Sequence, residues 1–133
     1  MRLIVFDLFL LLLMFVTTEG CYKQTNGCSV PGKLPFFYKK NFKPACDKHD
    51  VCYFCGEYYG WSRYRCDKAF LRDMRKICNR MSFFKRGACK VFAQGYYQAT
   101  RLGGESHYSK NSPDWCEKPC VKPSGDPRRS LRV

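Results

Sequence analysis

Apolar side chains recur at helical spacing in three stretches of the chain, and the first lies at about residues 44–59. Pro44 suits the first turn of a helix because that position needs no backbone N–H, and Asn41 lies close enough to cap it. Gly60 follows as a residue that can adopt the left-handed conformation in which helices commonly end. We therefore expect a helix over 44–59, preceded by an irregular segment over 21–42.

The second and third stretches extend this helical pattern. The second begins after Ser62 and ends at about Cys78 or Arg80, with one apolar face and one face rich in lysine and arginine. The third covers about 88–102 and is followed by two glycines. We expect it to pack through six apolar or small residues: Ala88, Val91, Phe92, Gly95, Ala99 and Leu102. Neither an internal repeat nor a strand-like alternation occurs, so the sequence predicts a mainly α fold.

Both ends of the chain differ from this helical middle. The first twenty residues combine a basic start, an apolar run and small residues ahead of Cys21, which is typical of a secretory signal peptide. The residues after 104 are polar and proline-rich, and only Cys116 and Cys120 are available to hold them. We expect a signal peptide, one domain and a basic tail that is flexible or processed: residues 1–20, 21–120 and 121–133.

The cysteine content and the charge narrow the functional class. Ten cysteines among 133 residues predict a disulfide framework of up to five bridges, whose pairing the sequence does not assign. Such a framework persists in oxidising compartments, so we expect a secreted, extracellular protein and no nucleic-acid partner. The formal net charge of +13 favours anionic partners, and a membrane surface, a polyanion or an acidic protein all remain open.

One face of the first expected helix carries groups that are unusual in a helical core. Cys46, His49, Asp50 and Tyr53 fall within about a third of the circumference at 100° per residue. An imidazole, a carboxylate and a phenol can be buried together only where they hydrogen-bond to one another or bind a ligand. This face is therefore a candidate site.

Asp67 lies in the middle of the apolar face of the second helix and also needs a partner. If the two helices pack antiparallel, a hydrogen bond between Asp67 and one ring nitrogen of His49 would fix the tautomer. The other nitrogen would then be available as a general base. Asp50, the next residue along the chain, could bind a hard cation such as Ca²⁺, which would need further oxygens from a glycine-containing loop.

The segment from Cys46 to Tyr53, with its His-Asp pair, resembles the catalytic-helix signature of secreted phospholipases A2. Further motifs in matching order extend this resemblance over roughly residues 22–102: Asn26-Gly27-Cys28, Pro44-Ala-Cys46, Cys66 to Met74 and Ala88-Cys89 to Ala99. The order is most similar to the bacterial and fungal branch of the superfamily and to the related conodipines of cone-snail venom. The resemblance implies a small disulfide-rich domain with two packed antiparallel catalytic helices and a third helix.

The resemblance also implies an activity. It indicates a calcium-dependent phospholipase A2 that hydrolyses the sn-2 ester of glycerophospholipids, as a venom-type component. His49 would activate the attacking water, Asp67 would orient His49, and Tyr53 would support Asp67 through a hydrogen bond. Asp50 would hold Ca²⁺, with a backbone carbonyl from Gly27 as a further ligand.

The calcium loop departs from the family pattern. The Cys-Gly-x-Gly-Gly loop of vertebrate and snake-venom enzymes is absent, and Asn26 stands where the bacterial type has an aspartate. An amide oxygen can bind Ca²⁺ but contributes no charge, so we expect Asn26 to make the metal site weaker.

Two other functions remain open from the sequence. One is a phospholipase-like toxin that acts mainly by binding a receptor or channel, or by charge-driven membrane disruption. The other is a basic polyanion-binding domain, which only the net charge supports. The Phe36-Phe37-Tyr38 run followed by Lys39-Lys40 predicts an exposed rim that docks on anionic or aggregated phospholipid.

The remaining motifs favour ordinary structural roles. Cys52 and Cys55 have the spacing of a redox or zinc motif, but structural disulfides fit an exported chain better. His107 lies in a polar segment and is expected to be a solvated loop residue. The Lys85-Arg86 and Arg128-Arg129 pairs are candidate processing sites, and cleavage at the first would give two disulfide-linked chains.

Overall fold

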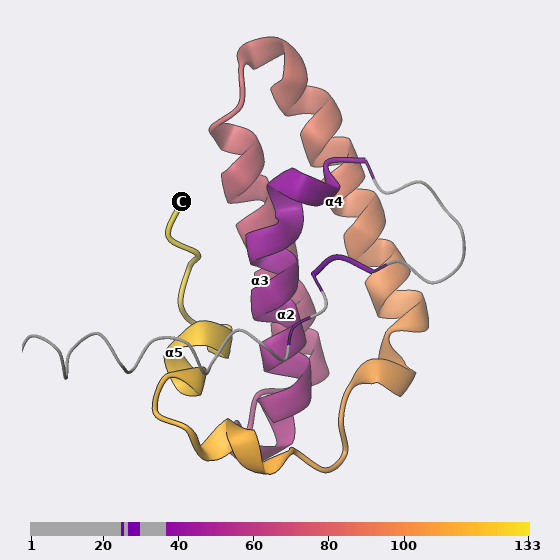
Figure 1. Cartoon of the computed structure of the whole chain (residues 1–133). Coiled ribbons are helices and arrows are strands. Elements are labelled where there is room, and N and C mark those ends of the chain that lie inside the picture. The colour runs from indigo at the N-terminus through magenta and orange to yellow at the C-terminus, as the bar shows by residue number, and fades with distance from the viewer. Residues whose placement is uncertain (1–24, 26, 30–36) are drawn as a thin grey trace, which may run out of the picture.

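The computed structural model describes residues 25, 27–29 and 37–133 (Figure 1). These residues form helices and no strand, as the sequence predicts. In chain order the elements are α2 Lys39–Tyr59, α3 Arg63–Asn79, α4 Phe83–Gly103, the 3₁₀ helices η1 Glu105–His107 and η2 Asp114–Glu117, and α5 Val121–Gly125. No described helix combines the length and the apolar character that crossing a bilayer requires. The expected signal peptide lies outside the described residues.

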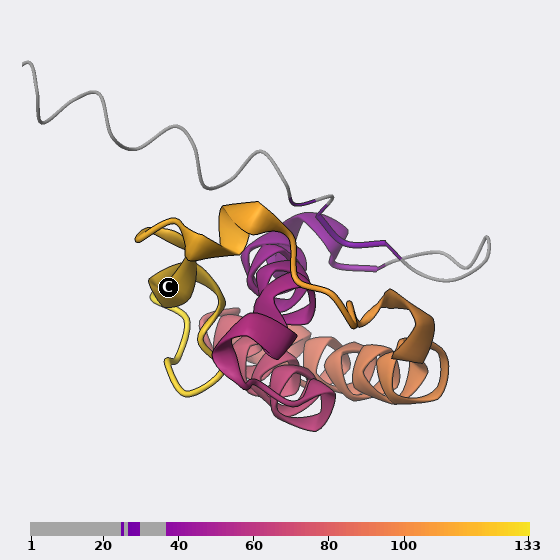
Figure 2. The ribbon, with the colours of Figure 1, turned by 90° about the horizontal axis from the view of Figure 1, so that it is seen from below.

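Helices α2, α3 and α4 form an up-and-down bundle in which α3 packs against both of the others (Figures 1 and 2). Only short turns connect them, so neighbouring helices run antiparallel. Among the described residues, four disulfides link the helices to one another or to neighbouring segments: Cys28–Cys46, Cys52–Cys66, Cys55–Cys116 and Cys78–Cys89. The expected fold class, a small disulfide-rich helical domain, is confirmed.

Helix α2 ends as predicted but begins earlier. Gly60 follows it with a φ of 68°, a left-handed conformation that glycine adopts without strain. The start at Pro44 is wrong, because α2 begins at Lys39 and Asn41 is an exposed residue inside the helix rather than its cap. The additional turn buries Phe42 completely in the core, and this burial offsets the backbone hydrogen bond that Pro44 cannot make.

Helix α3 has the predicted boundaries, and the Ser62 hydroxyl at its start accepts a hydrogen bond from the backbone N–H of Arg65. Helix α4 ends at the predicted glycines but begins at Phe83 rather than residue 88. Its expected packing face is wrong, because Val91 and Leu102 are 71% and 88% exposed. The Cys78–Cys89 disulfide pulls the opposite face of α4 onto α3.

The C-terminal segment is held by more than its cysteines. Helix α5 packs on α2, where Gly125 approaches Val51 so closely that a Cβ would lie 2.5 Å from its Cγ1. The buried Lys48 Nζ and the Arg72 guanidinium both donate hydrogen bonds to the backbone carbonyl of Arg129. The expectation that only the cysteines hold this segment is therefore wrong, while its processing stays a prediction.

Candidate active site

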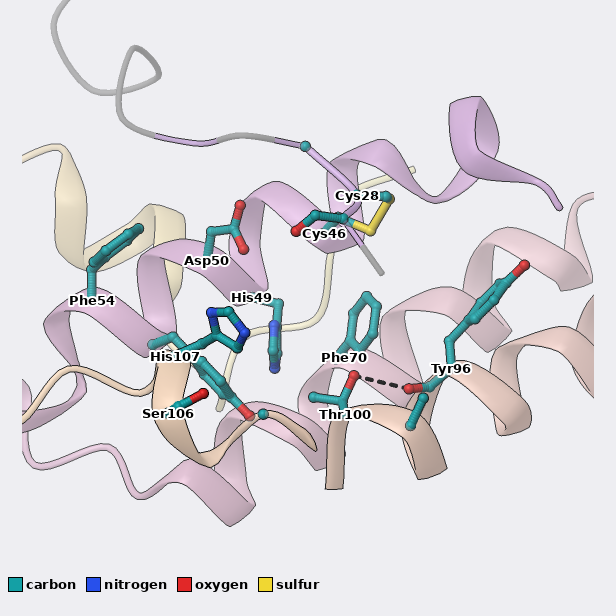
Figure 3. Close-up of a pocket in the computed structure, with 15 residues that line it drawn as sticks. Cys28, Cys46, His49, Asp50, Phe54, Phe70, Tyr96, Thr100, Ser106 and His107 are labelled. Atoms are coloured by element: carbon teal, nitrogen blue, oxygen red, sulfur yellow. Dashed lines mark hydrogen bonds between the residues drawn. A yellow bond between two sulfur atoms is a disulfide. The ribbon is translucent and has the colours of Figure 1, made fainter. Parts of the chain in front are cut away.

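A cavity of about 470 Å³ lies between α2, the end of α4 and the segment of residues 27–29 (Figure 3). Its lining includes four mostly apolar side chains: Phe54, Phe70, Tyr96 and Ala99. It also includes five polar side chains: His49, Asp50, Tyr53, Ser106 and His107. A largely apolar cavity with a few polar groups is typical of a small-molecule site.

Asp67 is the centre of a hydrogen-bond network at the back of this cavity. Its side chain is fully buried, and its Oδ1 accepts hydrogen bonds from His49 Nε2 at 2.8 Å and from the Tyr53 hydroxyl at 2.6 Å. Its Oδ2 accepts one from Arg101 Nη1 at 2.6 Å, and Arg63 Nη1 lies 3.9 Å away. The carboxylate is therefore satisfied on both oxygens, as burial of a charge requires.

Disulfides fix the elements that carry this network. The Cys52–Cys66 bond joins α2 to α3 immediately before Tyr53 and Asp67 on the two helices. His49 lies one helical turn before Tyr53, and its ring packs between the rings of Tyr53 and Phe70 at centroid distances of 4.1 and 4.7 Å. A cross-link next to both partners of His49 limits how far the hydrogen-bonded groups can separate.

Burial and hydrogen bonding shift the titration of these groups. Burial lowers the pKa of His49 below 6.5, and this outweighs the opposing effect of the Asp67 carboxylate. Burial acts to raise the pKa of Asp67, but the hydrogen bonds from His49, Tyr53 and Arg101 lower it below its ordinary value. Burial, followed by Asp67, raises the pKa of Tyr53. At neutral pH the network thus contains an ionised Asp67, a neutral His49 and a protonated Tyr53.

These protonation states define what His49 can do. Because an ionised Asp67 can only accept hydrogen bonds, Nε2 carries the ring proton and donates a hydrogen bond to the carboxylate. Nδ1 is therefore the unprotonated nitrogen. No hydrogen bond to Nδ1 occurs within the described part of the chain. A neutral, oriented imidazole on a side chain that lines a cavity can act as a general base.

Asp50 follows His49 on α2, lines the same cavity and points toward the segment of residues 27–29 (Figure 3). Gly27 lines the same cavity and has a φ of 67°, a left-handed conformation suited to glycine. Asp47 Oδ1 is buried near Gly27 and has no hydrogen-bond partner in the described residues. Carboxylate and carbonyl oxygens beside an unsatisfied carboxylate oxygen fit a hard cation such as Ca²⁺.

The cation ligands nevertheless cannot all be acidic or histidine side chains. In the part of the chain that the structure describes, no three His, Cys, Asp or Glu residues gather closely enough to hold a metal ion. A cation here would depend on backbone carbonyls, which the sequence analysis anticipated for Gly27. Asn26 lies outside the described residues.

Three residues around the cavity carry features that the sequence analysis missed. Arg63 and Arg101 both approach Asp67, and His107 lines the cavity although it is exposed. Arg63 could have been found, because it stands four residues before Asp67 on the same helix. Arg101 and His107 had no such signal, because their placement depends on the rotation of α4 and on the turn into η1.

Comparisons with known proteins add a family to this geometry. A model of the family described as prokaryotic phospholipase A2 matches residues 16–104. Conodipine-P3 from Conus purpurascens is 52% identical over 63 residues, which are 47% of this chain and 34% of that protein. The conodipine-M alpha chain from Conus magus is 46% identical over 63 residues, which are 79% of its length. The chain thus spans about a third of the length of conodipine-P3. No solved structure matched the chain.

Proposed function

Because the chain belongs to the prokaryotic phospholipase A2 family, we propose that it is an enzyme that hydrolyses the sn-2 ester of glycerophospholipids, with His49 as the general base. The observation that supports this most is the 2.8 Å hydrogen bond between His49 Nε2 and Asp67. It assigns the ring proton to Nε2 and leaves Nδ1 able to take a proton in the cavity.

The reaction begins with a water next to His49. His49 Nδ1 accepts a proton from this water while the water oxygen attacks the sn-2 carbonyl carbon. This attack gives a tetrahedral intermediate. Asp67 stabilises the imidazolium that forms, and Tyr53 and Arg101 keep Asp67 ionised and in place. The intermediate then expels the glycerol oxygen of the lysophospholipid, and His49 returns its proton to that oxygen. The products are a fatty acid and a lysophospholipid.

The apolar lining supports a lipid substrate. Phe54, Phe70 and Ala99 offer a surface on which an acyl chain can be buried next to His49. A water-soluble ester with a short chain would gain little from this surface, so we expect the rate to rise with acyl length.

Calcium belongs to this proposal as the cofactor. Asp50 and the carbonyl of Gly27 would hold the ion, with Asn26 as a further oxygen donor. When bound, the ion would supply positive charge for the carbonyl oxygen and for the substrate phosphate. Asp47 Oδ1 near Gly27 has no hydrogen-bond partner among the described residues and offers one further oxygen there, although Lys43 pairs with Oδ2 of the same carboxylate.

The same relatives support a setting for the enzyme. The disulfide framework and the likeness to the conodipines support a secreted, venom-type component whose partner is a phospholipid surface. The expected receptor or channel target and the expected cleavage into linked chains stay predictions.

The test is release of fatty acid from phospholipid vesicles labelled at the sn-2 position, with sn-1-labelled vesicles as the positional control. Release from sn-2 only, its loss with a calcium chelator and its fall by about a thousandfold in His49→Gln are the expected results. His107→Gln changes the only other histidine of the chain, which also lines the cavity, and should keep most of the release.

Two results would contradict the proposal. Equal release by wild type and His49→Gln would exclude His49 as the base. A wild type that binds vesicles but releases nothing, with or without calcium, would instead support the phospholipase-like toxin that acts through binding.

A further inference from the structure

The outward side of α4 exposes large apolar side chains at its start, near its middle and at its end. Phe84, Val91 and Leu102 are 92%, 71% and 88% exposed, and Phe83 beside them is 80% exposed. At 100° per residue, five residues share one direction and form what we call the outer face of α4: Phe84, Ala88, Val91, Gly95 and Leu102. All five are exposed, and the face runs about 27 Å at 1.5 Å per residue.

This face points away from the bundle. The buried residues of α4, Cys89 and Ala93, lie on the opposite side and pack toward α3, and Figures 1 and 2 place α4 at the edge of the bundle. Single exposed apolar residues are ordinary on protein surfaces, but several large ones on one side of a helix, here interrupted only by Gln98, favour an interaction surface.

The charges on α4 indicate what binds there. The helix carries four basic residues and no acidic one: Lys85, Arg86, Lys90 and Arg101. Two copies packed through this face would bring like charges together, which costs free energy. An amphipathic helix with apolar side chains between basic ones fits an anionic lipid surface, where apolar groups enter the acyl boundary and cations meet headgroups.

We propose that the outer face of α4 docks on the surface of an anionic phospholipid bilayer. The proposal rests on the phospholipase function proposed above and names the surface through which the enzyme meets its substrate. The expected rim at residues 36–40 stays a prediction, and its Phe36 lies outside the described residues.

The docking face adjoins the active-site cavity. Ala99 lines the cavity, and at 100° per residue it lies about 60° from Leu102 around α4. Phe37 extends the apolar surface toward the cavity, because its ring packs on Phe92 at 4.8 Å and its carbonyl accepts a hydrogen bond from Tyr96. Docking through α4 therefore brings the cavity to the lipid.

The test is co-sedimentation with vesicles of phosphatidylcholine and phosphatidylglycerol, measured in the His49→Gln background so that no lipid is consumed. The variant Phe84→Ser/Leu102→Ser removes the two most exposed side chains of the face. Because burial of one such side chain changes partition by about tenfold, the double variant should bind about a hundredfold more weakly. Tyr58→Ser removes a half-exposed aromatic at the far end of α2 and should change binding less than about twofold.

The outcomes separate this inference from the proposed function. Unchanged vesicle binding by the double variant, or an equal loss with Tyr58→Ser, would overturn it. A wild-type dimer that the double variant converts to monomer, with vesicle binding unchanged, would assign the face to a second copy and also overturn it. Hydrolysis of a monomeric short-chain phospholipid should be unaffected by the double substitution, so failure of the chemistry would appear there and not in sedimentation.

Discussion

Two buried acid–base pairs connect α2 and α3, and they differ in what covers them. On α2 the adjacent residues His49 and Lys48 supply the basic partners, and on α3 Asp67 and Asp73 supply the carboxylates. His49 faces the cavity, and its side chain keeps 10% of its surface exposed. The Lys48–Asp73 pair is covered by the C-terminal segment, where Asp73 also accepts a hydrogen bond from the backbone N–H of Leu131.

The difference shows how one helix pair serves both chemistry and stability. Burial lowers the pKa of Lys48, while Asp73, at 2.6 Å, acts in the opposite direction. Lys48 also donates to the Arg129 carbonyl, so this pair ties three segments together. The His49–Asp67 pair instead leaves one ring nitrogen without a bond inside the described chain, which is what a base needs.

The largest effect on stability should come from breaking the Lys48–Asp73 pair. Lys48→Met leaves Asp73 buried without its nearest cation, and we expect it to lower the free energy of unfolding by about 3 kcal/mol. Denaturant unfolding of the oxidised protein measures this. Lys43→Met breaks an exposed pair with Asp47 on the same helix and should cost less than about 1 kcal/mol. Equal losses of unfolding free energy in the two variants would contradict the structural role of the Lys48–Asp73 pair.

A smaller effect, on activity, should follow from removing one hydrogen-bond donor to Asp67. Arg101→Gln removes the 2.6 Å ion pair to Asp67 Oδ2, and we expect kcat/KM to fall about tenfold because Asp67 then holds its place and charge less well. Arg63→Gln removes a guanidinium that lies 3.9 Å from Asp67 Oδ2, and we expect it to lower kcat/KM by less. If Arg63→Gln proved the more damaging variant, the assignment of Arg101 as the nearer support would be wrong.

Tyr53→Phe should have a still smaller effect. It removes one hydrogen bond to Asp67 Oδ1, an oxygen that keeps its bond from His49, so we expect a loss of about fivefold in kcat/KM. Steady-state assays on vesicles measure it, with unfolding curves to separate activity from stability. A thousandfold loss would show that Tyr53 acts directly on the substrate rather than through Asp67.

The acidic limb of the dependence of kcat/KM on pH should lie below the pKa of an ordinary histidine. Burial lowers the pKa of His49, so the base is still neutral at pH 6.5 and activity falls only as the pH drops below that value. The unfolded chain takes up the His49 proton first, so acidification also destabilises the fold. The dependence of kcat/KM on pH at saturating calcium tests this, with His107→Gln as the control. An acidic limb above pH 6.5 would contradict the burial of His49.

The sequence could predict the elements whose signals are local. Ser62 marks the start of α3 and Gly60 the end of α2, and both were predictable because capping depends on a few neighbouring backbone groups. His49 and Asp67 stood out because polar groups on core faces require partners, and the structure places them in contact. The start of α2 was wrong because the burial of Phe42, a tertiary effect, outweighs the local signal of Pro44.

The rest depended on contacts that no local pattern encodes. Which face of α4 packs is decided by the Cys78–Cys89 bond, and ten cysteines leave the pairing open. Arg101 reaches Asp67 from α4, so this contact depends on how α4 packs against α3. The C-terminal segment is anchored through the backbone carbonyl of Arg129. Because every residue has such a carbonyl, the sequence does not indicate which one accepts these hydrogen bonds.

The most direct measurement compares Asp67→Asn with Asp73→Asn, with kcat/KM and the free energy of unfolding determined on the same preparations. We predict that Asp67→Asn lowers kcat/KM by about a hundredfold or more, because an amide cannot stabilise the imidazolium. Asp73→Asn should keep kcat/KM within about threefold per folded molecule and lower the free energy of unfolding by about 3 kcal/mol. Full activity in Asp67→Asn, or the same loss in both variants, would contradict the assignment of His49 and Asp67 as the catalytic pair.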